Sequence, residues 1–303
     1  MAIVSATAQQ APFKSGIDMV PLSVTVTDGS GRFVGGLNEN DFTVYEDGVK
    51  QAVSFFARSE VPVDVALVVD TSASMRDDLR LVQTAAMGLV RALGTADRGA
   101  VVEVNERAGI VQPFTGDRAN IENAINHLST AGSTALYDGL YVVLREFERE
   151  RRNTPQVRRQ VLVLLSDGLD NKSRLSFDDV LDLARRGDVG VYVIALPGQD
   201  PPASAQRQFG ASLLDAQYAM TTVARDSGGR VFKPKDAAEL PAIYSAIAQE
   251  LTSQYQLGYT PMRPGGDGAF RRVAVQVTEA QRARARTRAG YYASRSIASL
   301  YPR

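Results

Sequence analysis

Short apolar segments alternate with longer amphipathic ones from Val61 to about Leu251, and this pattern constrains the fold most strongly. The apolar segments are rich in valine, isoleucine and leucine, which favours buried strands. The longer segments, such as residues 79–93, carry apolar residues at every third or fourth position, which favours helices. Because strands that alternate with helices are typical of a parallel sheet covered on both faces, we predict a doubly wound, mainly parallel α/β fold.

The expected elements follow from these patterns. Strands are predicted at 63–69, 100–104, 110–114, 160–165, 191–196 and 230–232. Helices are predicted at 79–93, 119–127, 136–149, 177–186, 213–226 and 237–251.

The flanks of this region have a β pattern with hairpin-type turns, for example Asp28-Gly29 and Asp47-Gly48. Neither flank has enough strands to be stable alone, so we predict that both pair into one small antiparallel β-sandwich. The predicted organisation is a sandwich from 17–60 plus 252–293, an inserted α/β domain at 61–251, and a C-terminal tail at 294–303.

Residues 1–16 are predicted to be disordered or the remnant of a truncated secretory signal. Ala6-Thr7-Ala8 has the small-x-small pattern of a cleavage site, although the basic and long apolar parts of a signal are missing. We therefore expect a secreted, periplasmic or cell-envelope location. No apolar stretch approaches the roughly 18 residues of a spanning helix, so no transmembrane segment is expected.

Composition excludes several function classes. Lys plus Arg and Asp plus Glu are both 34, so no net charge of the chain points to nucleic acid, and a nucleic-acid partner is not expected. The chain has no cysteine, which excludes thiol catalysis and thiolate metal sites. The single histidine, His127, is predicted to lie at a helix end, which argues against a Ser-His-Asp hydrolase. Arginines at every second position from Arg282 to Arg288 are interpreted as one exposed face or edge of a strand, with a patch for an anionic ligand as the alternative.

Five polar residues in three separate segments are the candidate functional site. Asp70, Ser72 and Ser74 follow a predicted strand in VALVVDTSASM, Thr134 precedes a helix in GSTALYDGL, and Asp167 follows a strand in VLVLLSDGLDN. Loops of this kind gather at the carboxyl ends of parallel strands, where ligands bind. Carboxylates and hydroxyls without thiol or imidazole suit a hard divalent cation, and Mg²⁺ accepts a site with few protein carboxylates. Aspartate and serine are also ordinary helix caps and turn residues, so any one of these loops by itself stays ambiguous.

The three motifs resemble the metal-ion-dependent adhesion site of von Willebrand factor type A domains, in that family's order. The resemblance covers roughly Val61 to Leu251, and the flanks VTDGSGRFVGGLNENDFTVYEDG and SQYQLGYTP are similar to an acidobacterial subfamily of such proteins. It implies a Rossmann-like fold and a metal held by Asp70, Ser72, Ser74, Thr134 and Asp167. It further implies that an acidic side chain of a protein or peptide partner completes the metal shell. Mg²⁺ is expected, with Mn²⁺ and Ca²⁺ as alternatives.

Two nearby carboxylates are not predicted to be metal ligands. Asp138 is expected to support the Thr134 loop through hydrogen bonds, and Asp170 to lie in a solvent-facing turn.

The leading functional hypothesis is a metal-dependent protein-binding module that is not an enzyme. One alternative is a Mg²⁺-dependent phosphoryl-transfer or hydrolytic enzyme, but the sequence has no glycine-rich phosphate loop with lysine and no Asp-x-Asp pair. Another is a structural component of the cell envelope whose metal site is vestigial. The sequence leaves the oligomeric state open.

Overall fold

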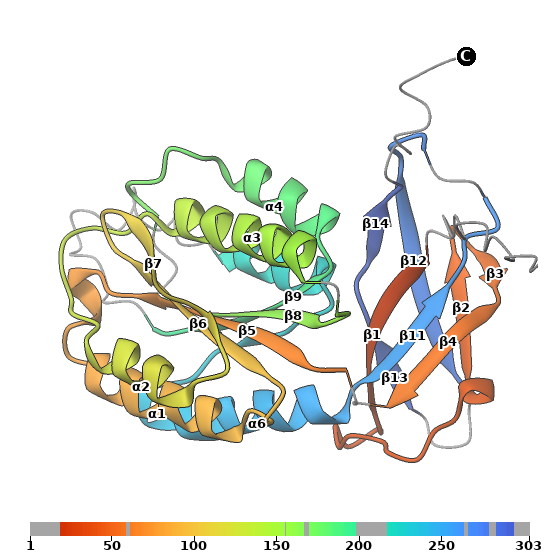
Figure 1. The fold of residues 1–303 in the computed structure, drawn as a ribbon, viewed down its shortest axis with the longest axis horizontal. Helices are drawn as coiled ribbons and strands as arrows, with labels where there is room; N and C mark the ends of the chain where they lie inside the picture. Colours follow the sequence, from red (N-terminus) through yellow and green to blue (C-terminus); the bar gives the residue numbers. More distant parts are fainter. Residues whose placement is uncertain are drawn as a thin grey trace, which may run out of the picture.

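A parallel sheet flanked by helices lies beside two small antiparallel sheets (Figure 1). The computed structural model describes residues 19–58, 61–154, 156–166, 170–197, 217–263, 266–278 and 283–293. Among the helices in these ranges, none combines the length and the apolar character needed to span a lipid bilayer.

The larger sheet has six strands in the order β10-β9-β8-β5-β6-β7. Its strands are β5 (Val63–Asp70), β6 (Arg98–Val104), β7 (Ala108–Thr115), β8 (Arg159–Ser166), β9 (Val189–Ala195) and β10 (Val231–Phe232). All neighbours pair in parallel except β7, which is antiparallel to β6. Every residue of β5 is buried, as its continuous apolar run predicts for a central strand.

Helices cover both faces of this sheet (Figure 1). One face packs against α1 (Leu79–Ala92), α2 (Arg118–Asn126) and α6 (Leu240–Ser253). The other packs against α3 (Leu136–Asn153), α4 (Phe177–Arg186) and a helix described at 217–226. A hydrophobic core lies on each face of the sheet. Side chains along a strand point to opposite faces in turn, so Val65 and Leu67 of β5 pack into the first core. Ala66 and Val68 pack into the second.

The predicted fold class is confirmed. Predicted strand ends differ from the observed ones by at most two residues, and α4 has the predicted bounds. The predicted helix at 237–251 begins with a 3-10 turn, Ala237–Glu239, and α3 runs four residues further than predicted. The beginning of the predicted helix at 213–226 lies outside the described residues.

The two antiparallel sheets have four strands each, in the orders β13-β1-β11-β4 and β14-β12-β2-β3. Their bounds are β1 (Val20–Thr27), β2 (Phe42–Glu46), β3 (Val49–Gln51), β4 (Val53–Arg58), β11 (Tyr255–Tyr259), β12 (Phe270–Val277), β13 (Arg284–Arg286) and β14 (Gly290–Tyr292). Each sheet joins strands that precede the α/β region to strands that follow it. The β2–β3 turn has positive φ at Asp47 (47°) and Gly48 (83°), as the Asp-Gly pair predicts.

A buried carboxylate connects the α/β region to the antiparallel sheets. Glu250, at the end of α6, accepts hydrogen bonds from Thr25 on β1 (3.1 Å) and from the Tyr192 hydroxyl on β9 (2.6 Å). It also pairs with Arg286 on β13. Arg286 is half-buried and Arg288 is buried, so the expectation that these alternate arginines form one exposed face is wrong for both.

The order of the strands creates a switch point beside β5. The chain leaves β5 towards β6 on one side, and later continues with β8 on its other side. In open α/β sheets, ligands bind in the crevice at the carboxyl ends of the two strands at such a point. In this chain those ends are Asp70 and Ser166.

Candidate functional site

Asp70 is the buried carboxylate at the switch point. Its side chain is fully buried, and its two oxygens accept hydrogen bonds from different elements. Oδ1 accepts from the backbone N–H of Ser72 at 2.9 Å, and Oδ2 accepts from the Ser166 hydroxyl at the end of β8 at 2.7 Å. These bonds fix the orientation of the carboxylate.

Ser72 and Ser74 lie on the turn between β5 and α1. Ser72 is buried and Ser74 is exposed, and their hydroxyl oxygens are 2.9 Å apart. Mg²⁺ bonds its oxygen ligands at ~2.0–2.1 Å in an octahedron, which places adjacent ligand atoms about 3 Å apart. The spacing of the two hydroxyls therefore fits neighbouring positions around such an ion.

Backbone hydrogen bonds join this turn to the loop that precedes α3. The Ala131 amide donates to the Thr71 carbonyl at 2.8 Å, and the Ala73 amide donates to the Gly132 carbonyl at 3.0 Å. Gly132 adopts a positive φ of 62° in this loop, where a side chain would also collide with Glu106. The second loop is thereby fixed against the first.

Thr134 is buried in the second loop and is bound to the segment after β8. Its amide donates to the Asn171 side chain at 3.1 Å, and its carbonyl accepts from the amides of Asn171 and Lys172, each at 3.1 Å. The structure thus brings the loops carrying Asp70, Ser72, Ser74 and Thr134 together. Asp167, the fifth predicted residue, lies outside the described residues, directly after Ser166.

The described donor set fits a hard cation in its chemistry. It consists of one buried carboxylate and three hydroxyls, with no sulfur or imidazole among them. Within the described part of the chain there is no group of three or more His, Cys, Asp or Glu side chains placed to hold a metal.

Four further polar residues hold the loops of the site together, and two of them, Ser166 and Asn171, were not singled out from the sequence. Ser166 and Asn171 orient Asp70 and Thr134, as described above. Asp170 is half-buried rather than solvent-facing as expected: its carboxylate accepts from the Tyr137 amide in the first turn of α3 at 2.9 Å. Asp138 was expected to support the Thr134 loop, but its carboxylate accepts from the amides of Arg174 and Leu175, both at 3.1 Å, and so supports the segment after β8.

The comparison with protein families decides the classification. The model of the von Willebrand factor type A domain matches residues 64–246, more than half of the chain. The chain belongs to this family. The match spans β5 to α6 and therefore includes the strand ends and loops described above.

Known proteins resemble this von Willebrand factor type A chain to different extents. An uncharacterized protein of Synechocystis is 33% identical over 111 residues, which are 36% of this chain and 26% of that protein. The match thus spans about a quarter of that relative. A von Willebrand factor type A structure from Catenulispora acidiphila has a TM-score of 0.53 at 13% identity, over 96% of this chain and 78% of that one.

A mussel protein resembles the chain in fold and was solved with a metal. Proximal thread matrix protein 1 from the mussel byssus, described with a zinc-occupied metal-ion-dependent adhesion site, has a TM-score of 0.50 at 19% identity. The similarity covers 68% of this chain and 49% of that one. At these identities the two structures show a shared fold.

Proposed function

We propose that this von Willebrand factor type A protein is a metal-dependent protein-binding module. Asp70, Ser72, Ser74, Thr134 and Asp167 would hold Mg²⁺, with Mn²⁺ and Ca²⁺ as alternatives. A protein or peptide partner would complete the metal shell with an acidic side chain. Domains of this family often mediate protein interactions, which supports a binding role.

The convergence of the loops is the observation that carries the proposal. Two segments far apart in the sequence carry Asp70, Ser72, Ser74 and Thr134 to one edge of the sheet, and hydrogen bonds join both to a third segment through Ser166 and Asn171. Asp70 and Ser72 have side chains that short-range bonds already orient. A site whose ligands are held in place before binding loses little entropy when the ion enters.

The chemistry of the donor set favours an acidic partner. A divalent cation held by two carboxylates and three neutral hydroxyls has few anionic ligands and stays electrophilic enough to accept another carboxylate. An acidic side chain from outside would complete the metal shell, so partner and metal would bind interdependently. The zinc-occupied site of the mussel protein supports the metal-binding part of the proposal as a parallel within the same fold.

Binding is proposed here rather than catalysis. The single histidine, His127, directly follows α2 and is exposed, with its ring Nδ1 2.7 Å from the Asn123 carbonyl oxygen of that helix.

We further propose membership of the acidobacterial subfamily and a secreted, periplasmic or envelope location. The proposed modules remain residues 17–60 plus 252–293 for the sandwich and 61–251 for the α/β domain.

Capture of a partner with and without metal tests this function. The chain is immobilised, and proteins of the source organism's envelope fraction are retained in Mg²⁺ and eluted with EDTA. We expect a specific partner that EDTA releases and that the Asp70→Ala variant does not retain, because the variant lacks the buried carboxylate ligand.

Asp182→Ala is the matched control, because Asp182 is a surface carboxylate paired with Arg186 on α4. This variant should capture the partner as the native chain does. Partner binding that persists both in EDTA and in Asp70→Ala would refute the proposed function.

A further inference from the structure

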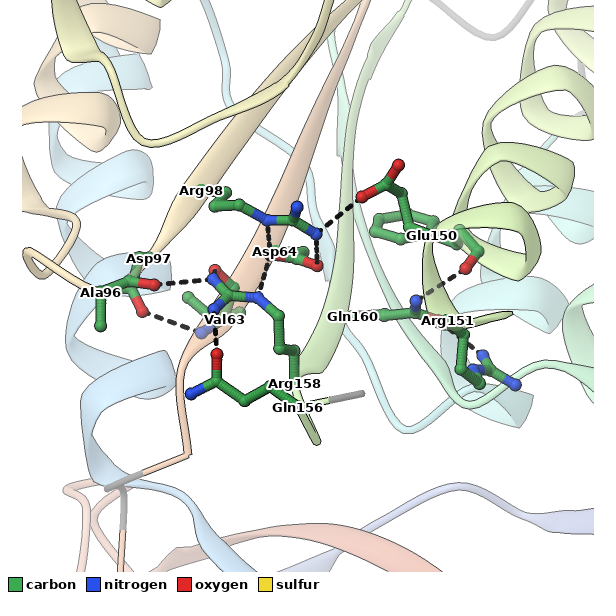
Figure 2. Close-up of polar contacts among 11 residues, drawn as sticks. Val63, Asp64, Ala96, Asp97, Arg98, Glu150, Arg151, Gln156, Arg158 and Gln160 are labelled. Atoms are coloured by element: carbon green, nitrogen blue, oxygen red, sulfur yellow. Dashed lines mark hydrogen bonds and ion pairs between the residues drawn. The ribbon is translucent and has the colours of Figure 1, made fainter. Parts of the chain in front are cut away.

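A cleft of about 600 Å³ lies between the α/β region and the antiparallel sheets, away from the candidate metal site. Its walls include Asp64 at the start of β5, Gln160 on β8, Phe55 on β4 and Leu257 on β11. Asp70 is at the other end of β5, about 20 Å from Asp64 at the usual rise of a strand. Figure 2 shows the charged wall on the α/β side, with Asp64 between Arg98 and Arg158.

One part of the cleft is apolar and open to solvent. Met19, Phe55 and Val157 line it and belong to the few large apolar side chains that are exposed in the described chain. Val157 is 75% exposed. Exposed apolar side chains that gather around one cleft indicate a binding surface, whereas isolated ones do not.

The charge of the lining is positive, with five arginines and three carboxylates. The three carboxylates are already paired with arginines. Asp64 contacts Arg98 (2.7 Å) and Arg158 (2.6 Å), and Glu150 contacts Arg98 (2.9 Å). Asp188 contacts Arg288 at 3.3 Å. Arg186 is paired with Asp182 outside the lining at 2.7 Å, so Arg151 and Arg159 are the lining arginines without an ion pair in the described part of the chain.

Arg159 is a cation that these pairs leave uncompensated. Its guanidinium donates to the carbonyls of Val61 (3.0 Å) and Leu251 (2.7 Å) and to the Gln254 side chain (3.0 Å). In the described part of the chain it forms no ion pair with a carboxylate. Burial lowers its pKa from the ordinary value, against the opposing effect of the negative charge of Asp97. A guanidinium nevertheless stays protonated in proteins, so the charge persists.

Two further donors in the lining have no acceptor. Gln256 and Arg288 both line the cleft and are at least nine-tenths buried. The Gln256 Nε2 and Arg288 Nε atoms have no hydrogen-bond partner among the described residues. Unsatisfied buried donors are uncommon and costly in native proteins, so they indicate a missing acceptor.

We propose that this cleft binds a small amphipathic anion, with its acidic group near Arg159 and its apolar body against Met19, Phe55 and Val157. The positive charge of Arg159 accounts for the acidic group. The exposed apolar side chains account for the body. The site is independent of the candidate metal site and of the function proposed for it.

The test uses the dye 8-anilinonaphthalene-1-sulfonate, which combines an aromatic body with one sulfonate. Its binding to the full chain is measured by fluorescence titration in EDTA, with Val157→Asp and Val157→Lys as a matched pair at the exposed rim. We expect Val157→Asp to weaken binding about fivefold or more, and Val157→Lys to tighten it, because the two variants place opposite charges near the anion.

Two controls make the result specific. Val111→Asp changes an exposed valine on β7, outside the cleft, and should bind the dye as the native chain does. The uncharged analogue N-phenyl-1-naphthylamine should bind the native chain more weakly than the charged dye does. Its affinity for the two Val157 variants should be similar. Thermal unfolding of each variant is followed in parallel, because partly unfolded protein also binds such dyes. Equal dye affinity in Val157→Asp and Val157→Lys would overturn the proposal, as would equal affinity for the neutral analogue.

Discussion

At the scale of single residues, the hydroxyl of Ser166 orients a candidate metal ligand, because it holds Asp70 from the neighbouring strand at 2.7 Å. Residues that orient a metal ligand typically contribute 10–100-fold to metal affinity. We therefore expect Ser166→Ala to raise the Mg²⁺ dissociation constant by roughly tenfold, measured by isothermal titration calorimetry. The control is Ser253→Ala, because the Ser253 hydroxyl donates only within α6, to Gln249 at 2.7 Å. Equal Mg²⁺ affinity in native chain and Ser166→Ala would contradict this role.

The convergence of the loops in the candidate site could be predicted from the sequence. The loops of Asp70, Ser72, Ser74 and Thr134 each follow a strand or precede a helix in a parallel sheet, and such loops gather at one edge. The role of Ser166 could not be predicted, because it depends on a hydrogen bond to a residue 96 positions away. The inward position of half-buried Arg286 could not be predicted for the same reason, since it depends on an ion pair with Glu250 on α6.

At the scale of elements, one buried carboxylate joins strands from both ends of the chain. Glu46 on β2 contacts Arg271 on β12 at 3.2 Å, and accepts from the hydroxyls of Tyr259 on β11 and Tyr291 on β14, each at 2.8 Å. Burial, and then the hydrogen bond to Glu46, raise the pKa of Tyr291 to about 12. The pKa of Tyr259 is raised by the same two causes.

These shifts predict that alkaline pH destabilises the antiparallel sheets. The folded state keeps the phenol proton at a pH where the unfolded chain, with an ordinary tyrosine pKa near 10, has lost it. The contribution of Tyr291 is thus fully present below about pH 10 and is lost as the pH rises towards about 12. Urea unfolding at several pH values measures the free energy of unfolding, which should fall between about pH 10 and 12. It should fall less steeply with pH in Tyr291→Phe than in the native chain. The same pH dependence in both proteins would contradict the assignment.

The pairing of the flanking strands was easier to predict than their charged core. Turn dipeptides and alternating apolar residues indicate strands, and strands too few to be stable alone must find partners elsewhere in the chain. Alternation does not reveal that Glu46 and Arg271 point inward, since charged residues are usually assigned to solvent.

At the scale of the whole molecule, the buried Glu250 contacts connect the α/β region with β1 and β13. We therefore expect the chain to unfold in one cooperative transition, so that a ligand at the candidate metal site stabilises the entire molecule. Binding raises the free energy of unfolding, and this increase grows with the logarithm of the ratio of the ligand concentration to its dissociation constant.

Thermal unfolding with and without Mg²⁺ is the most direct test of the central claim. At a Mg²⁺ concentration about 100 times its dissociation constant, binding adds ~2.7 kcal/mol to the free energy of unfolding. For a chain of this size that corresponds to a rise in Tm of a few degrees. We expect this rise in the native chain and in Asp182→Ala, and its absence in Asp70→Ala. A native chain with the same Tm in millimolar Mg²⁺ and in EDTA would contradict the assignment of a metal site.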